Sequence, residues 1–156
     1  MIEIERKFLV KDRSFETMAT KKTRLSQGFL SIEPERTVRV RISDEKAWIT
    51  VKGLGSEDGT SRFEWEKEIP GSEGRALLLL CKPSLIEKTR YLVPFGAHLF
   101  EVDVFEGDNA GLIVAEIELS HAQESFEIPT WLSEEVTGNK AYYNASLSQM
   151  PFSSWS

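Results

Sequence analysis

A chain of 156 residues, 40% hydrophobic and 28% charged, is long enough to form one soluble globular domain with a substantial core. Its formal net charge of −6 argues against nucleic acid as the main partner, because phosphate backbones attract basic surfaces. The longest apolar run, residues 76–81, is too short to cross a bilayer, so no membrane partner is expected.

The first strand is expected over residues 2–10, where charged and apolar side chains alternate. Side chains of a strand point to opposite faces in turn, so Glu3, Glu5 and Lys7 share one face. Met1 leads directly into this strand, without the basic and apolar regions of a secretory signal. We therefore expect a cytoplasmic protein.

Seven more strands are expected between clusters of turn-forming residues. They cover residues 27–32, 36–43, 46–53, 62–69, 85–93, 98–105 and 112–119. The short and regular spacing favours an antiparallel barrel or sandwich over alternating strand–helix units.

Three helices are expected to interrupt the strands. They cover residues 72–82, a short stretch from Ser120, and residues 139–149. The second would begin with a capping box formed by Ser120 and Gln123. Residues 150–156 are expected to form a loosely held tail. No linker, repeat or low-complexity tract divides the chain, so residues 1–156 are expected to form a single domain.

Charged residues of the same parity recur in most of the expected strands. The acids are Glu3, Glu5, Glu64, Glu66, Glu101, Asp103, Glu116 and Glu118, and the bases are Lys7, Arg39, Arg41, Lys52, Lys88 and Arg90. With 25 acidic residues in the chain, a single acidic pair at this spacing is expected by chance, so the signal is the repetition. These residues form either the wetted faces of half-buried strands or the lining of one charged cavity.

A cavity with both kinds of charge restricts the ligand. Clustered arginines and lysines bind a compact polyanion, and an arginine can grip two oxygen atoms at once. Clustered carboxylates repel the same polyanion unless divalent cations lie between them, and Mg²⁺ prefers a few carboxylates together with phosphate oxygens and water. The mixture therefore predicts a metal-bridged phosphate chain as the small-molecule partner.

The N-terminal run Glu3-Ile4-Glu5-Arg6-Lys7 resembles the ExExK signature of the CYTH superfamily, the triphosphate tunnel metalloenzymes. The resemblance extends through Arg39-Val40-Arg41, Lys52, Glu64-Trp65-Glu66, residues 87–91, residues 101–105, Glu116-Ile117-Glu118, residues 131–137 and Lys140. It implies an α+β fold in which eight antiparallel strands close into a tunnel with a charged lumen. It also implies a substrate that is a triphosphate or nucleoside triphosphate, used with a divalent metal. The compact layout is similar to that of the small bacterial inorganic triphosphatases.

The resemblance and the charges together assign roles. The expected substrate-binding residues are Lys7, Arg39, Arg41, Lys52, Lys88, Arg90 and Lys140. The expected ligands of Mg²⁺ or Mn²⁺ are Glu3, Glu5, Glu116 and Glu118, and Glu64, Glu66 and Asp103 are expected to hold metal, water or neighbouring cations. Glu5 and Lys88 are the expected catalytic residues, with Lys88 as the acid for the leaving oxygen.

Two departures from the family pattern stand out. Small bacterial relatives often have Gly-Tyr where this chain has Gly28-Phe29, so a tyrosine hydroxyl is absent there. The terminal helix carries a single lysine, Lys140. Of the other reactive residue types, Cys81 is expected to pack as a small hydrophobic residue, and His98 and His121 to lie at the surface.

Three alternatives to an inorganic triphosphatase stay open. A class IV adenylate cyclase needs an adenine pocket, and the sequence shows no clear set of residues for one. A thiamine triphosphatase needs a wall for the thiamine rings, which Trp48 or Phe29 could supply. A polyphosphate- or nucleotide-binding module without turnover would gain nothing from so many carboxylates. The oligomeric state is left open between a monomer and a homodimer.

Overall fold

The computed structural model describes residues 1–155 of the chain. Its strands are β1 (Ile2–Val10), β2 (Lys21–Glu33), β3 (Arg36–Ser43), β4 (Lys46–Gly53), β5 (Ser61–Pro70), β6 (Lys82–Phe95), β7 (His98–Phe105), β8 (Ile113–Glu118) and β9 (Leu132–Glu135). Its helices are α1 (Gly71–Leu78) and α2 (Asn144–Leu147), with the 3-10 turns η1 (Ser14–Met18), η2 (Gly107–Asn109), η3 (Lys140–Tyr142) and η4 (Phe152–Ser154). Within this part of the chain, no helix has the length and apolar character needed to span a membrane.

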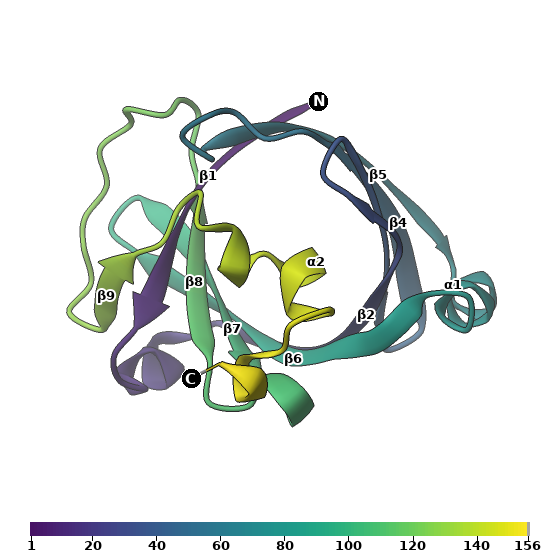
Figure 1. The fold of residues 1–156 in the computed structure, drawn as a ribbon. Helices are drawn as coiled ribbons and strands as arrows, with labels where there is room; N and C mark the ends of the chain where they lie inside the picture. The colour runs from purple at the N-terminus through teal and green to yellow at the C-terminus, as the bar shows by residue number, and fades with distance from the viewer. Residues whose placement is uncertain (156) are drawn as a thin grey trace.

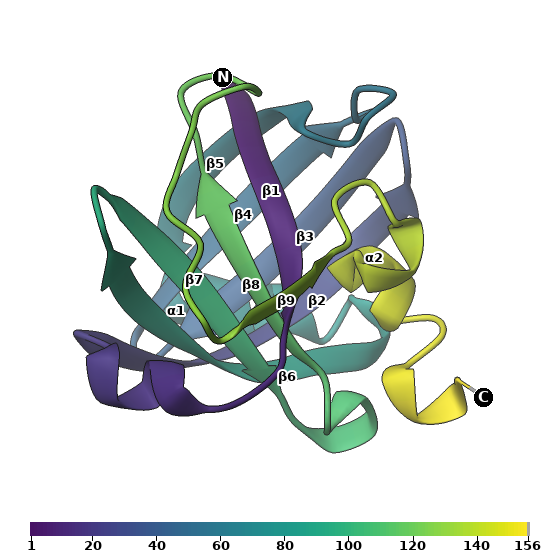
Figure 2. The ribbon, with the colours of Figure 1, turned by 90° about the vertical axis from the view of Figure 1, so that its left-hand side faces the viewer.

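The strands form a closed antiparallel barrel, seen along its axis in Figure 1 and from the side in Figure 2. They follow the order β5-β4-β3-β2-β6-β7-β8-β1, and β1 closes the ring by pairing with β5 through Ile2 and Phe63. The ninth strand, β9, pairs with β1 on the side of the barrel. The predicted closed eight-stranded α+β barrel is confirmed, with β9 as an addition that the sequence pattern did not indicate.

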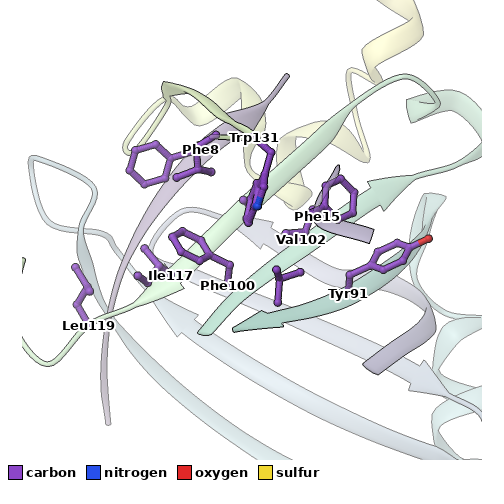
Figure 3. Packing of buried hydrophobic residues seen from close by; sticks show 11 residues of the cluster. Phe8, Phe15, Tyr91, Phe100, Val102, Ile117, Leu119 and Trp131 are labelled. Carbon is purple, nitrogen blue, oxygen red and sulfur yellow. The ribbon is translucent and has the colours of Figure 1, made fainter. Parts of the chain in front are cut away.

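The main hydrophobic core lies on the outer face of the barrel. It is built from the alternate residues of β7 and β8, such as Phe100, Val102 and Ile117, which are fully buried. Phe15 of η1 and Trp131, just before β9, cover this face, and aromatic rings meet there edge to face (Figure 3). Because β7 and β8 pack their apolar residues outward, their charged residues Glu101 and Glu116 point into the lumen.

A smaller apolar cluster closes one end of the lumen. Ile86 and Val114 lie two residues before Lys88 and Glu116, so they share the inward face of β6 and β8. Leu147 of α2 is fully buried against them. In Figure 1, α2 lies within the ring of strands, and Figure 2 places it at one end of the barrel. The C-terminal segment thus closes one mouth of the barrel.

Two strands are longer than the sequence pattern indicates. β2 begins at Lys21 instead of residue 27, and β6 begins at Lys82 instead of residue 85. The added parts of β2 are rich in polar residues, but residues 21–26 pair with residues 87–92 of β6. The hydrogen bonds of the neighbouring strand therefore extend β2 beyond its apolar region.

The prediction of a short helix from Ser120 is wrong. The structure has bends and turns there, and the Ser120 amide donates to Oε1 of Glu124 at 2.6 Å instead of forming a capping box with Gln123. The second oxygen of Glu124 contacts Nε2 of His98 at 2.6 Å, so a tertiary contact holds the side chain that bonds Ser120.

The other two helices are shorter than expected. The first ends at Leu78, which leaves Leu79 and Leu80 exposed. The segment 139–149 divides into η3 and α2 because Tyr143 between them has extended backbone. This break directs the side chains of Tyr143 and Asn144 toward the lumen.

Residues 150–155 of the expected tail make specific contacts, and residue 156 lies outside the described residues. The ring of Trp155 packs against Tyr142 and Phe152, with centroid distances of 5.2 Å in both pairs. The Phe152 amide donates to Oδ1 of Asn109 at 2.8 Å. Aromatic packing thus holds this segment against the end of the barrel.

Candidate active site

A cavity of about 540 Å³ occupies the lumen and brings the predicted charges together. All of the predicted substrate-binding residues and metal ligands line it, as do Glu64 and Glu66. Its basic residues are Lys7, Arg39, Arg41, Lys52, Arg62, Lys88, Arg90 and Lys140, and its acidic residues are Glu3, Glu5, Glu57, Glu64, Glu66, Glu101, Glu116 and Glu118. The alternating charges are therefore the lining of one cavity rather than wetted outer faces.

Arg39 and Arg41, the two arginines of β3 that line the cavity, are held mainly by neutral groups. Arg41 donates from Nε to Oε1 of Gln27 at 3.0 Å, and no carboxylate of residues 1–155 lies within ion-pair distance of it. Arg39 donates to Oγ1 of Thr50 at 3.1 Å and lies 3.4 Å from Glu66. Burial, together with the neighbouring arginines, lowers the pKa of Arg41 well below its usual value. Bringing an anion into the cavity would relieve this excess of positive charge.

Asp103 is not part of the cavity lining, but it holds two basic residues that are, Arg90 and Lys88. It accepts two hydrogen bonds from Arg90, at 2.8 and 2.9 Å, and lies 2.8 Å from Nζ of Lys88. Burial alone would raise the pKa of Asp103, but Arg90 and Lys88 lower it strongly. Of the three roles considered for Asp103, the geometry favours holding neighbouring cations.

Lys88 is almost completely buried, with 1% of its surface exposed. Its ammonium group lies close to Asp103 and donates to Oδ1 of Asn144 at 2.9 Å. Burial lowers the pKa of Lys88 to about 7, because Arg90 and Arg41 add repulsion and Asp103 only partly offsets these effects. An amine that titrates near neutral pH can donate a proton and recover it.

Lys52 bridges two acidic residues on the opposite wall. Its Nζ lies 2.8 Å from Glu3 and 3.3 Å from Glu64. Burial raises the pKa of Glu3, and Lys52 partly opposes this effect. Glu64 thus pairs with Lys52, and Glu66 pairs with Arg39.

Glu5 and Glu116 form a pair of interacting carboxylates. They lie on the paired strands β1 and β8, where Lys7 is opposite Glu116 and Glu5 is opposite Glu118. Burial and the nearby Glu116 raise the pKa of Glu5 well above its usual value. Although burial opposes it, Lys7 and the hydrogen bond from Glu5 lower the pKa of Glu116. When both carry charge, therefore, the two carboxylates repel each other.

This donor set fits a divalent cation that also binds phosphate. Two carboxylates that repel each other can share a cation, since the cation removes that repulsion. Among residues 1–155, no three Asp, Glu, His or Cys side chains lie close enough together to hold a metal ion by themselves. The protein would supply few ligands, and oxygen atoms of phosphate and water would complete the shell, as Mg²⁺ prefers. Glu118 is exposed at the rim, opposite Glu5.

Several cavity residues were not among the predicted site residues. Arg62 shares the parity of Glu64 and Glu66 on β5, a signal that could have identified it. Its guanidinium lies 5.8 Å from the ring centroid of Tyr143, and Nζ of Lys7 lies 5.1 Å from the same centroid. Tyr143 belongs to the break between η3 and α2, which no sequence pattern indicated.

A second recess of about 390 Å³ adjoins the mouth of the charged cavity. The two share Ile32, Lys140, Ala145 and Ser146. The rest of the recess is lined by Ala141, Gln149, Met150 and Trp155, so it is mainly apolar. Lys140 is exposed between the two spaces. Phe29 lines the charged cavity, whereas Trp48 lines neither space.

Comparisons with known proteins agree with this geometry. The chain is 40% identical over 151 residues to an inorganic triphosphatase of Acetivibrio thermocellus, covering 96% of this chain and 95% of that protein. It is 37% identical over 152 residues to an inorganic triphosphatase of Nitrosomonas europaea, covering 94% and 97%. A crystal structure of an inorganic triphosphatase matches with a TM-score of 0.65 and 32% identity, over 94% of this chain and 97% of that one. The CYTH domain model matches residues 1–153, and the chain therefore belongs to the CYTH family.

Proposed function

We propose that the protein is a divalent-metal-dependent hydrolase that converts inorganic triphosphate to diphosphate and phosphate. The observation that carries this proposal is the position of Arg41, a half-buried cation held by a neutral amide, in the same cavity as the Glu5–Glu116 pair. The wall of the cavity at Arg41 has too little negative charge nearby, and the wall at Glu5 and Glu116 has too little positive charge nearby. A phosphate chain bound with a metal supplies both.

The basic residues would bind and orient the phosphate chain. Arg39, Arg41 and Arg90 offer guanidinium groups that can each hold two oxygens, and Lys7 and Lys52 add point charges. Mg²⁺ or Mn²⁺, held by Glu5 and Glu116 with Glu3 and Glu118 nearby, would neutralise charge and polarise the phosphoryl group under attack. Lys88 would donate a proton to the leaving oxygen, and its low pKa favours that transfer.

A second candidate is an organic triphosphate such as thiamine triphosphate or ATP. The recess that adjoins the cavity is the observation that favours it, because its apolar walls could pack against a ring system. Only Lys140, Ser146 and Gln149 offer polar side chains there, so the recess has few groups with which to select one base. We therefore place inorganic triphosphate first.

A phosphate-release panel tests these proposals. Inorganic triphosphate, ATP and thiamine triphosphate are compared at matched Mg²⁺ and at matched Mn²⁺, with cyclic AMP measured in the same samples. The expected result is the highest kcat/KM for inorganic triphosphate, no cyclic AMP, and no turnover in excess EDTA. Faster release from ATP or thiamine triphosphate would support the second candidate. Cyclic AMP formed at the rate of ATP consumption would indicate a cyclase, and binding without turnover would indicate a binding module.

The metal site has its own test in the Glu5→Gln variant. Replacing the carboxylate by an amide removes one anionic ligand at almost constant shape, so phosphate release should fall nearly to background. Glu73→Gln is the matched control, because Glu73 lies on α1 outside the barrel. Equal activity of the two variants would contradict the assignment of Glu5.

A further inference from the structure

The segment after β9 reaches the lumen and is held there by several contacts. The Val136 amide donates to the Lys7 carbonyl at 2.8 Å, and Leu147 is fully buried in the apolar cluster at the end of the barrel. The Asn139 side chain accepts from the Ala141 amide and caps η3. None of these contacts involves the side chain of Asn144, the first residue of α2.

The Asn144 side chain is the central member of a partly buried polar network. Its Oδ1 atom accepts from Nζ of Lys88 and from Nε2 of Gln27, both at 2.9 Å. Gln27 is fully buried, and its Oε1 accepts from Nε of Arg41 at 3.0 Å. The network thus joins the C-terminal segment to one basic residue on β3 and one on β6.

The orientation of each amide follows from its neighbours. An ammonium group and an arginine Nε are donors only, so each must face an amide oxygen. Oδ1 of Asn144 therefore faces Lys88, and Oε1 of Gln27 faces Arg41. This leaves Nε2 of Gln27 to donate to Asn144. The contact between the side-chain amides of Gln27 and Asn144 then joins a donor to an acceptor. The network is therefore compatible with a single orientation of each amide.

The network leaves one hydrogen of Lys88 for the cavity. An ammonium has three donors, and Asp103 and Asn144 occupy two of them. Among the contacts of residues 1–155, the third has no hydrogen-bond acceptor, although Nζ lies 5.4 Å from the ring centroid of Phe105. Lys88 is part of the cavity lining. Two fixed hydrogen bonds prevent rotation about the Cε–Nζ bond, so the third hydrogen keeps a constant direction.

We propose that Asn144 is a positioning residue for the hydrolysis reaction. Its side chain directs the free hydrogen of Lys88 toward the leaving oxygen. It acts with Gln27, which holds Arg41 in register with Lys88. The inference rests on the proposed function and extends it, because it assigns a role in the chemical step to the segment that closes the barrel. Proton donation by a well-placed acid contributes about a hundredfold or more to rate, and a misaligned donor loses much of that factor.

The decisive variants are Asn144→Leu and Asn144→Asp. Leucine keeps the approximate shape but accepts no hydrogen bond. It should lower kcat by roughly 10- to 100-fold, with KM changed less than threefold. Aspartate keeps an acceptor oxygen for both donors, so it should recover most of kcat. Its added negative charge should also move the alkaline limb of the pH profile to higher pH, because it adds to the attraction of Asp103 against the repulsion of Arg41 and Arg90.

Asn139→Leu is the matched control. It removes the same side chain from the same segment, but this side chain caps η3 and lies outside the cavity lining. Both leucine variants should melt cooperatively, and only Asn144→Leu should show the selective loss of kcat. The proposal is overturned if the two variants lose kcat equally, if Asn144→Leu retains kcat within twofold of the unmodified protein, or if it changes KM alone.

A measurement without substrate separates this proposal from the proposed function. The NMR signal of the Lys88 side chain, assigned with Lys88→Arg, is titrated with pH in the metal-free protein and in each variant. Its midpoint should fall in Asn144→Leu and rise in Asn144→Asp. An unchanged midpoint in both variants overturns the contact, whether or not the protein hydrolyses triphosphate. Failure of the proposed function would instead appear as no phosphate release from the unmodified protein.

Discussion

At the scale of single residues, the basic groups of the lumen differ in how they are held. Lys88, Arg90 and Lys52 are paired with carboxylates, which fix their positions and reduce their net charge. Arg41 is held by a neutral amide, and no carboxylate of residues 1–155 pairs with it to offset its charge. The cations paired with carboxylates thus have fixed positions, whereas Arg41 offers a charge that is not offset. A bound anion should stabilise the cations held by neutral groups most.

This difference makes Arg41→Ala a sharp test. The variant should lower kcat/KM for triphosphate by roughly 10- to 100-fold, since a charge-assisted hydrogen bond contributes about 1.5–3 kcal/mol. Without ligand, its free energy of unfolding should stay within about 1 kcal/mol or rise, because the substitution removes repulsion by Arg39 and Arg90. Arg39→Ala should behave in the same way.

Arg24→Ala is the control for this variant. Arg24 is exposed and forms its ion pairs with Glu87 and Glu106 outside the cavity, so its loss should leave kcat/KM unchanged. Loss of the cooperative thermal transition in unliganded Arg41→Ala would show that this arginine supports the fold.

The pKa of Lys88 predicts a pH dependence. Because burial lowers this pKa to about 7, the acid form is lost from the free protein as pH rises through that value. The ratio kcat/KM should therefore fall above about pH 7. The charge of bound triphosphate raises the pKa of Lys88, so kcat should persist to higher pH than kcat/KM. Lys88→Arg, which stays protonated, should lower the rate and remove this limb. Identical pH profiles of the two proteins would contradict the role of Lys88.

Strand parity predicted most of the charged cavity residues, although it was not applied to Arg62. Arg39, Arg41, Lys52 and Glu116 follow directly from a period of two. The same rule cannot distinguish a charge that faces the ligand from one that fixes a neighbour, which is why Asp103 was left with several roles. Gln27 and Asn144 are neutral residues on different elements, so only tertiary structure could reveal their contact.

At the scale of elements, strands were easier to predict than helices. A strand of this barrel packs on one face and lines the lumen with the other, which produces the alternation read at β1, β3 and β7. The segments outside the barrel follow no such period, because single contacts determine their conformation. After Ser120, the contact between Glu124 and His98 accompanies turns where a helix was expected. The extended backbone at Tyr143 divides the expected C-terminal helix in two.

One contact between elements joins the loop after β4 to the C-terminal segment. Gly59 and Gly138 both have positive φ, 78° in each case, and their backbones meet. A Cβ atom on Gly59 would overlap Cα of Gly138, and one on Gly138 would lie 2.9 Å from the Asp58 carbonyl oxygen. Only glycine permits both the conformation and the close approach.

Gly59→Ala should therefore separate the loop from the closing segment. We expect it to lower the free energy of unfolding by about 2–4 kcal/mol, combining the left-handed conformation with overpacking. It should also lower kcat, because Tyr143 and Asn144 follow the contact. Gly107→Ala is the matched control, since Gly107 also has positive φ but no atom would lie within 4 Å of its Cβ. The control should lose only about 1–2 kcal/mol, and an equal loss in the two variants would show that the backbone contact is weak.

At the scale of the whole molecule, the residues that stabilise the fold and the residues of the candidate site lie on opposite faces of one sheet. The aromatic core of Phe15, Phe100 and Trp131 lies outside the barrel and stabilises the fold. The lumen holds charges that are only partly offset, such as Arg41 and the two interacting carboxylates Glu5 and Glu116, with Lys7 3.9 Å from Glu116. Their repulsion opposes folding when no ligand is bound. The ligand should then stabilise the folded state strongly, because it neutralises both kinds of charge.

This arrangement predicts a thermal shift that needs metal and phosphate chain together. With Mg²⁺ and a triphosphate whose bridging oxygens are replaced by methylene, at about 100 times the dissociation constant, linkage adds about 2.7 kcal/mol. For a protein of this length, that corresponds to a rise in Tm of about 5–10 °C. The analogue alone should give much less, because Glu5 and Glu116 repel it, and Mg²⁺ alone should give little, because too few ligands surround it. Glu5→Gln should weaken the joint effect, whereas Glu73→Gln should preserve it. If the analogue in EDTA raised Tm as much as the analogue with Mg²⁺, the carboxylates of the lumen would have to serve some purpose other than holding a metal against the phosphate chain.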